Sequence, residues 1–126
     1  MKTNLIAPCG MNCAVCSGFL RDTNKCPGCR AIWELSRKYI KKCIIRNCSE
    51  MKNRNLKYCS DKCGYYPCDR LKRLDKRYRT KYGMSMIENL ESIKNNGIKH
   101  FVNNEKKRWI KGNKIFCVHK KRYYNM

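Results

Sequence analysis

The chain has 126 residues, with thirty Lys and Arg against nine Asp and Glu, and it contains eleven cysteines. This length suits one domain with a modest core, so we expect a single domain over residues 1–126. No apolar run approaches the roughly 20 residues that a membrane-spanning helix needs, so we expect no integral membrane protein. Only three consecutive apolar residues precede Pro8, against roughly 7–15 in a signal-peptide core, so we expect a cytoplasmic protein.

The first 68 residues hold ten of the eleven cysteines and many Pro and Gly turn signals. Such a density indicates either disulfides in a secreted protein or metal binding in a reducing compartment. The short apolar N-terminus favours metal, and an odd number of cysteines would leave one thiol over in a closed disulfide set. We therefore predict that metal ligation, rather than a large apolar core, organises residues 1–68.

Two Cys-x-x-Cys pairs form the clearest motif in this half. Cys13 pairs with Cys16 and Cys26 with Cys29, nine residues separate the pairs, and Pro27-Gly28 supplies a tight turn in the second. Zinc takes four soft ligands in a tetrahedron, and two cysteines separated by two to four residues can both reach one ion. These four thiols predict a four-cysteine zinc site.

A second cysteine cluster follows, and its ligands are harder to assign. Its members are Cys43, Cys48, Cys59, Cys63 and Cys68, and Cys9 is a fifth member of the first cluster. Either each cluster has one spare thiol or ligands cross between them, so the spacing predicts about two zinc ions and leaves the pairing open. Cys117 and His119 form a late pair that is weaker ligand evidence; we expect Cys117 to be buried as a small hydrophobe and His119 to be exposed.

Helical periodicity is the main signal between and after the cysteine clusters. Helices are expected over residues 31–51, 67–82, 85–96 and 98–112, and residues 114–126 are expected to be extended or frayed. Pro67 can open the second helix and Gly83 can end it, while Ser85 and Glu88 form a capping box for the third. The predicted fold is mainly α: a small cysteine-rich domain pinned by metal knuckles (1–68), followed by amphipathic helices (69–112) and a basic tail (113–126).

Iron–sulfur ligation is the chemical alternative to zinc, because clusters are also held by four thiolates. Cys9, Cys13 and Cys16 have the form of a cluster-binding triplet, although the ferredoxin-type run of four cysteines is absent. Soft thiolate sites select both zinc and iron–sulfur clusters, so the spacing leaves both open. A thioredoxin-type redox pair is less favoured, because no strand pattern flanks Cys13 or Cys26.

Several motifs taken together resemble a known family. They are Cys9-Gly10-x-x-Cys13-x-x-Cys16, Cys26-x-Gly28-Cys29-Arg30, Cys43-x-Ile45-Arg46-x-Cys48, Cys63-x-x-Tyr66-Pro67-Cys68, and the later Asn89-Leu90, Ile93-Lys94, Gly97, Trp109 and Cys117-Val118-His119. Most of the chain is thereby similar to the cysteine-rich prokaryotic domain of unknown function 3795. Cys59-x3-Cys63 departs from the Cys-x-x-Cys expected at that point. The resemblance implies a cysteine-dependent, zinc-binding domain and implies no reaction.

The positive charge indicates an acidic partner. The residues that carry this prediction are Arg70, Arg73, Arg77 and Arg79 on the helix expected over 67–82, with Lys107 and Arg108 on a later helix. Basic helices can contact the phosphates of RNA or DNA, or another acidic partner. A bias toward Lys and Asn, as an AT-rich genome produces, would explain a lysine-rich surface without any ligand, but that bias does not favour arginine.

Catalytic motifs are absent from the sequence. There is no Walker A sequence, dinucleotide fingerprint, serine elbow or defensible carboxylate pair, and His100 is expected to be partly exposed and structural. Closed cysteine sites stabilise folds rather than catalyse. We therefore expect a non-enzymatic, zinc-stabilised binding module whose partner is RNA, DNA or another acidic molecule; the alternative is an iron–sulfur or thiol-redox protein.

Overall fold

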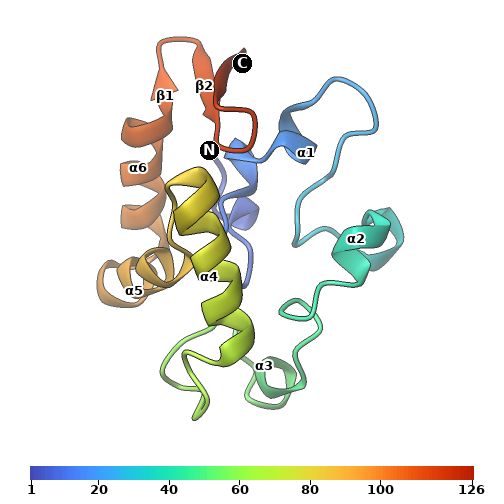
Figure 1. The fold of residues 1–126 in the computed structure, drawn as a ribbon, viewed down its shortest axis with the longest axis vertical. Coiled ribbons are helices and arrows are strands. Elements are labelled where there is room, and N and C mark those ends of the chain that lie inside the picture. Colours follow the sequence, from blue (N-terminus) through green and yellow to red (C-terminus); the bar gives the residue numbers. More distant parts are fainter.

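A computed structural model describes all 126 residues, except the side chain of Trp33. Three long helices and a small sheet form the second half of the chain, and short helices joined by turns form the first half (Figure 1). The expected mainly helical fold is confirmed at this level. Among the described residues, no helix combines the length and apolar character that a membrane crossing demands.

The three long helices are α4 (Asp69–Tyr82), α5 (Met86–Asn96) and α6 (Ile98–Trp109). Gly83 ends α4 in the left-handed conformation, at φ 63°, which glycine adopts without a steric cost. The hydroxyl of Ser85 accepts a hydrogen bond from the backbone N–H of Glu88, so the N-terminal half of the expected capping box is present. All three predicted helices are present, and α4 begins two residues later than expected.

The C-terminal residues form an antiparallel sheet instead of a frayed tail. Strands β1 (Ile110–Lys111), β2 (Lys114–Cys117) and β3 (Arg122–Asn125) pair in that order. Because β1 begins at Ile110, α6 ends earlier than the expected Gly112. Ile115 and Cys117 point into the core from β2, and Ile115 pairs with Tyr124 of β3. The sheet thus covers one end of the helical core.

The N-terminal segment 6–15 crosses the centre of this core. Ile6, Asn12 and Val15 are fully buried. The backbone N–H of Val118 donates to the carbonyl of Val15 at 3.0 Å, and the amide of Asn12 donates to the carboxylate of Glu105 at 3.3 Å. The first cysteines of the chain are therefore fixed against α6 and the sheet, which are formed by the last residues of the chain.

The remainder of the first half consists of short elements. They are 3-10 turns at Thr3–Leu5, Cys13–Val15 and Trp33–Leu35 and helices α1 (Ser17–Leu20), α2 (Lys38–Lys41) and α3 (Ser49–Asn53). The prediction of one helix over 31–51 is wrong, because Arg37 and Cys48 have extended backbone conformations that interrupt it. Ile32 and Leu35, two of the apolar residues that suggested it, are more than 60% exposed, so this part of the stripe has no core to pack against.

Two arginines hold this half together through hydrogen bonds to the backbone. Arg30 donates to the carbonyls of Ile6 and Lys57, both at 2.6 Å. Arg46 donates at 2.7 Å to the carbonyl of Ala31, and also to the hydroxyl of Ser36. A guanidinium has several donors in a rigid plane, so one side chain can join two distant loops. Side-chain bonds to loop carbonyls replace regular secondary structure here.

Candidate metal centre and basic cavity

The first predicted ligand group lies together in space. The backbone N–H of Cys29 donates to the sulfur of Cys13 at 3.4 Å. The thiol of Cys29 also forms a hydrogen bond with the sulfur of Cys13. This hydrogen bond raises the pKa of Cys29 and lowers the pKa of Cys13. Burial raises the pKa of Cys16, and the nearby Cys13 and Cys26 raise it further. The four thiols predicted from the two Cys-x-x-Cys pairs are therefore neighbours.

The thiols of the second predicted group also lie near one another. Burial raises the pKa of Cys59 to about 12, and four nearby thiols add to the effect. In order of decreasing effect these are Cys68, Cys48, Cys63 and Cys43. Members separated by up to 25 positions in the sequence thus lie near enough to Cys59 to raise its pKa.

Cys9 and Cys43 connect the two groups. Burial raises the pKa of Cys9 to about 12; a hydrogen bond from the backbone of Met11 opposes this rise, and Cys43, Cys13 and Cys59 add to it. Cys9 is thus close to thiols of both clusters, and Cys43 lies near both Cys9 and Cys59. The sequence left open whether each cluster has one spare thiol or ligands cross between the clusters, and this arrangement leaves both assignments open.

Backbone N–H groups are directed at several of these sulfurs. Besides the bond to Cys13, the backbone of Gly18 and Phe19 donates to Cys16 and lowers its pKa against the effect of burial. Hydrogen bonds of this kind stabilise a thiolate, whereas burial without a cation favours the neutral thiol. All eleven cysteines are free, and among the described residues no three Cys, His, Asp or Glu side chains converge closely enough to hold an ion as they stand.

The late pair, Cys117 and His119, differs in burial and in hydrogen bonding. Cys117 is fully buried in β2, as expected. His119, which we expected to be exposed, is half-buried. Its Nδ1 accepts a hydrogen bond from the backbone N–H of Ser17 at 3.1 Å, and its Nε2 lies 2.8 Å from the hydroxyl of Tyr78. Both ring nitrogens of His119 are therefore occupied within the protein, and burial lowers the pKa of its imidazole.

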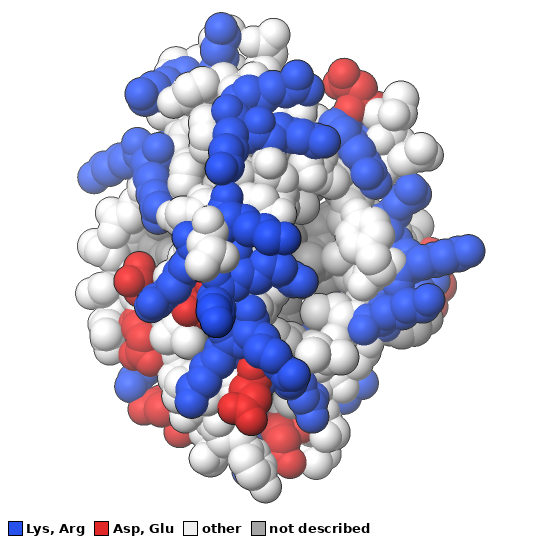
Figure 2. All heavy atoms as spheres, in the orientation of Figure 1, with Lys and Arg blue, Asp and Glu red and all other residues white. Residues whose placement is uncertain are grey.

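A cavity of about 650 Å³ opens beside the first cysteine group. The cysteines in its lining are Cys9, Cys13, Cys16, Cys29 and Cys43. The basic residues in its lining are Arg21, Lys42, Arg70, Arg73 and Arg77. Tyr39, Tyr78 and His119 also line it. In the space-filling view, Lys and Arg side chains gather around a recess between the parts of the surface that carry α4 and α2 (Figure 2).

The six predicted nucleic-acid contacts do not share one face. Arg70, Arg73 and Arg77 line the cavity from α4. Arg79 instead bonds to the buried Asp75 at 2.9 Å. Arg108 lies 4.4 Å from the Trp109 ring centre on α6, where Lys107 is exposed. The basic surface therefore divides into a cavity wall and a separate patch on α6.

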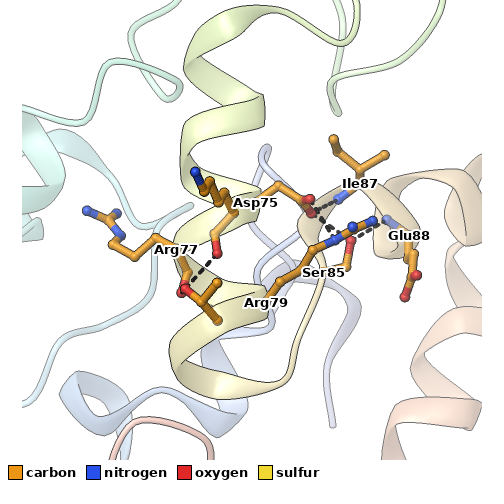
Figure 3. A network of polar contacts seen from close by, with 8 residues as sticks. Asp75, Arg77, Arg79, Ser85, Ile87 and Glu88 are labelled. Carbon is orange, nitrogen blue, oxygen red and sulfur yellow. Dashed lines mark hydrogen bonds and ion pairs between the residues drawn. The ribbon is translucent and has the colours of Figure 1, made fainter.

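Asp75 is a residue that the sequence interpretation missed. Its carboxylate accepts hydrogen bonds from the hydroxyl of Ser85 at 2.6 Å and from the backbone N–H of Ile87 at 3.0 Å (Figure 3). In Figure 3 the guanidinium of Arg79 turns toward this network, whereas that of Arg77 extends to the other side of α4. Asp75 is the one acid in the interior of a strongly basic helix, whose other acid, Asp69, is its first residue, and this position was the available signal. Asp75 joins the start of α5 to α4 and fixes the helix that carries the cavity arginines.

No family model, curated protein or solved structure matches the chain. The resemblance to the domain of unknown function 3795 therefore stays a prediction.

Proposed function

We propose that residues 1–68 form a thiolate metal centre that holds about two zinc ions and stabilises a basic binding module. The observation that carries this proposal is the proximity of the thiols within two neighbouring groups, with backbone N–H groups directed at the sulfurs of Cys9, Cys13 and Cys16 in the first. Cys13, Cys16, Cys26 and Cys29 would hold one ion. Cys48, Cys59, Cys63 and Cys68 would hold the other, with Cys9 and Cys43 between them.

The donor chemistry fits zinc. The pKa of Cys9 and that of Cys59 are both about 12, so these thiols stay neutral near pH 7 unless a cation lies beside them. A bound metal ion supplies that charge and deprotonates a coordinating thiol outright. Binding would require the side chains of each group to turn toward a common point, a small rearrangement in a half built from loops.

The weak packing of the cysteine half gives an ion a structural role. Ile32, Leu35, Tyr39 and Ile44 are all more than half exposed. A loop region that buries so little apolar surface gains little from the hydrophobic effect, and structural zinc sites supply folding free energy directly. Thiolate centres persist where cysteines stay reduced, so we place the protein in the cytoplasm.

Elemental analysis tests the proposal on protein purified anaerobically without chelators. About two zinc per chain is expected. The double variants Cys13→Ser/Cys16→Ser and Cys63→Ser/Cys68→Ser should each lose one zinc, while Cys117→Ala, which changes a core thiol outside both groups, should keep two. Protein that carries no stoichiometric metal, or equal metal loss in all three variants, would overturn the metal centre.

An iron–sulfur cluster is the second candidate, and the cavity favours it. Cys9, Cys13 and Cys16 all line this space, which is larger than a single ion needs, and basic side chains border it. Those cations would offset the negative charge that a thiolate-bound cluster carries. Iron with equimolar acid-labile sulfide and a visible absorption band, both lost in Cys13→Ser/Cys16→Ser, would support the cluster over zinc.

The acidic partner of the module is proposed from the charge of +21. Exposed lysines and arginines attract nucleic-acid phosphates, and such binding weakens steeply with salt. Retention of the protein on immobilised single-stranded RNA and duplex DNA across a salt series tests this. Elution at the low salt that releases an unrelated basic protein of similar charge would argue against a dedicated partner.

A further inference from the structure

The cavity beside the first cysteine group has a charged wall supplied by one helix. Arg70, Arg73 and Arg77 lie at positions i, i+3 and i+7 of α4 and all line the cavity. Residues at these intervals share one helix face. The opposite side of the cavity comes from α1, α2 and the turn after α2, which bring Arg21 and Lys42. Two parts of the chain therefore contribute cations to one partly enclosed space.

No carboxylate side chain in the described lining balances this positive charge. None of the described lining residues is an aspartate or a glutamate. The ion pair of α4 joins Arg79 to Asp75 on the other side of the helix. Like charges around a space with protein walls raise its electrostatic potential, because the walls screen less than bulk water does. An anion that enters the cavity would relieve this repulsion.

The planar guanidinium groups of the three arginines favour phosphate as the anionic group. A guanidinium offers two parallel N–H donors that match two oxygens of a phosphate or carboxylate. One carboxylate has only two oxygens, whereas a terminal phosphate has three and bears up to two charges, so it can satisfy several guanidinium groups at once. Arg70, Arg73 and Arg77 together therefore suit a phosphate better than a carboxylate.

The walls of the cavity favour an apolar or aromatic body attached to that phosphate. Tyr39 and Ile44 line the cavity and remain 52% and 56% exposed, which is unusual for large apolar side chains. Ile40 and Leu74 extend the same lining. The volume of about 650 Å³ falls within the range of roughly 300–1,000 Å³ typical of small-molecule sites. The space thus suits a nucleotide-sized molecule with one charged end.

We propose that this cavity binds an organic phosphate of nucleotide size, with the phosphate at Arg73 and Arg77 and the apolar part against Tyr39 and Ile44. The ligand is either a free nucleotide or the terminal nucleotide of a nucleic-acid strand. The inference rests on the proposed metal centre only in that Cys9, Cys13 and Cys16 form part of the cavity lining. Phosphate binding itself is assigned to the arginines.

Isothermal titration calorimetry of the metal-analysed protein at moderate salt tests the proposal. The probes are adenosine monophosphate, adenosine and inorganic phosphate. We expect the monophosphate to bind more tightly than either fragment. Arg73→Gln/Arg77→Gln should weaken it at least tenfold. Lys72→Gln/Lys76→Gln removes the same charge from α4 at exposed lysines outside the cavity lining, and it should change affinity less than threefold. Circular dichroism confirms that both variants fold.

A second arm separates the two sources of the ligand. A short single-stranded RNA with a 5′ phosphate that competes with adenosine monophosphate, and loses affinity in Arg73→Gln/Arg77→Gln, would identify a strand end as the ligand. Failure of that RNA to compete, with the monophosphate bound, would identify a free nucleotide. Equal weakening by both charge variants would overturn the proposal, because it would show non-specific attraction.

The failures of the two proposals are distinguishable in the same samples. Zinc-loaded protein that binds none of the probes would overturn the phosphate site and leave the metal centre standing. Protein without stoichiometric metal that binds adenosine monophosphate through Arg73 and Arg77 would overturn the metal centre alone. If the protein carries an iron–sulfur cluster and binds no probe, the cavity is the site of the cluster, and the phosphate-site proposal is overturned.

Discussion

The two halves of the molecule are stabilised by different interactions. Residues 69–126, with the segment 6–15, bury Leu71, Met86 and Leu90 in a common apolar core, and their helices have defined caps. Residues 16–68 contribute Ile45 and Met51 to this core but leave other large apolar side chains exposed, and arginine hydrogen bonds to loop carbonyls join their segments. One half is held by apolar burial, and the other needs a different source of free energy.

Metal removal should have the largest effect and should be confined to the cysteine half. Chelation of the zinc is expected to destabilise residues 16–68 by about 5 kcal/mol or more, since structural zinc sites contribute roughly 10–16 kcal/mol of binding free energy. Amide hydrogen exchange should rise across 16–68 while α4, α5 and α6 stay protected. Uniform exchange over the whole chain would show that the two halves are not energetically distinct.

A pair of leucine substitutions compares the packing of the two halves. Leu71 is 1% exposed and Leu35 is 64% exposed. Leu71→Ala should lower the free energy of unfolding by about 3 kcal/mol, because it removes buried methyl groups and leaves a cavity. Leu35→Ala should change it by less than about 0.5 kcal/mol. Urea denaturation measures both, and similar losses would mean that the apolar residues of both halves contribute alike.

The carboxylate of Asp75 should matter more than exposed carboxylates. Asp75→Ala would leave the hydroxyl of Ser85 and the backbone N–H of Ile87 without their acceptor. We expect a loss of about 2 kcal/mol, mostly from these hydrogen bonds, because the side chain of Arg79 is 56% exposed and the ion pair is screened. Asp61→Ala removes an exposed ion pair with Lys94 and serves as the control, with no measurable change expected in thermal denaturation.

The smallest expected effect is a pH dependence at Glu105 within the helical core. Burial raises the pKa of this carboxyl, against a hydrogen bond from Asn12 that lowers it. The carboxyl of Glu105 therefore keeps its proton to a higher pH in the folded state than in the unfolded state. The stability that this carboxyl contributes is present below the unfolded pKa and is lost as pH rises through the folded pKa. Glu105→Gln keeps the acceptor for Asn12 and should remove this loss.

The difference in unfolding free energy between Glu105→Gln and the parent protein measures this effect. It should grow in favour of the variant as pH rises from the unfolded pKa of about 4.3 through the folded pKa. Effects of pH on metal binding are common to both proteins and cancel in the difference. A constant difference at all pH values would mean that the carboxyl has the same pKa in the folded and unfolded states.

Local signals explain which parts of the fold were predicted correctly. Gly83 and the Ser85 cap fix helix ends through the backbone of adjacent residues, so α4 and α5 were placed from the sequence, although Pro67 lies two residues before α4 rather than at its first position. The helix over 31–51 failed because helical spacing shows which residues share a face, but not whether a core lies beside it. The strands were missed because β1 has only two residues and its partners are fixed by tertiary contacts.

The candidate site also has one part that local sequence spacing predicts and another part that depends on tertiary packing. Cys13, Cys16, Cys26 and Cys29 could be grouped from spacing alone, since each pair acts within four residues. The approach of Cys9 to Cys43, the cavity and the contribution of Arg21 and Lys42 to its lining depend on how α4 packs against the loops. No sequence pattern recorded that three arginines on α4 face thiols from the other half.

The hydrogen bonds that join residues 15–17 to residues 118–119 near the C-terminus have a consequence for synthesis of the chain. Ser17 bonds to His119, 102 positions later, and Val15 to Val118. At roughly 5–20 residues per second, the ribosome exposes the first thiols about 5–20 s before their partners emerge. During that interval the nascent cysteines are open to oxidation and to the wrong metal ion. Translation of a transcript truncated before β2 would release a thiol-rich fragment that can never bury its first cysteines.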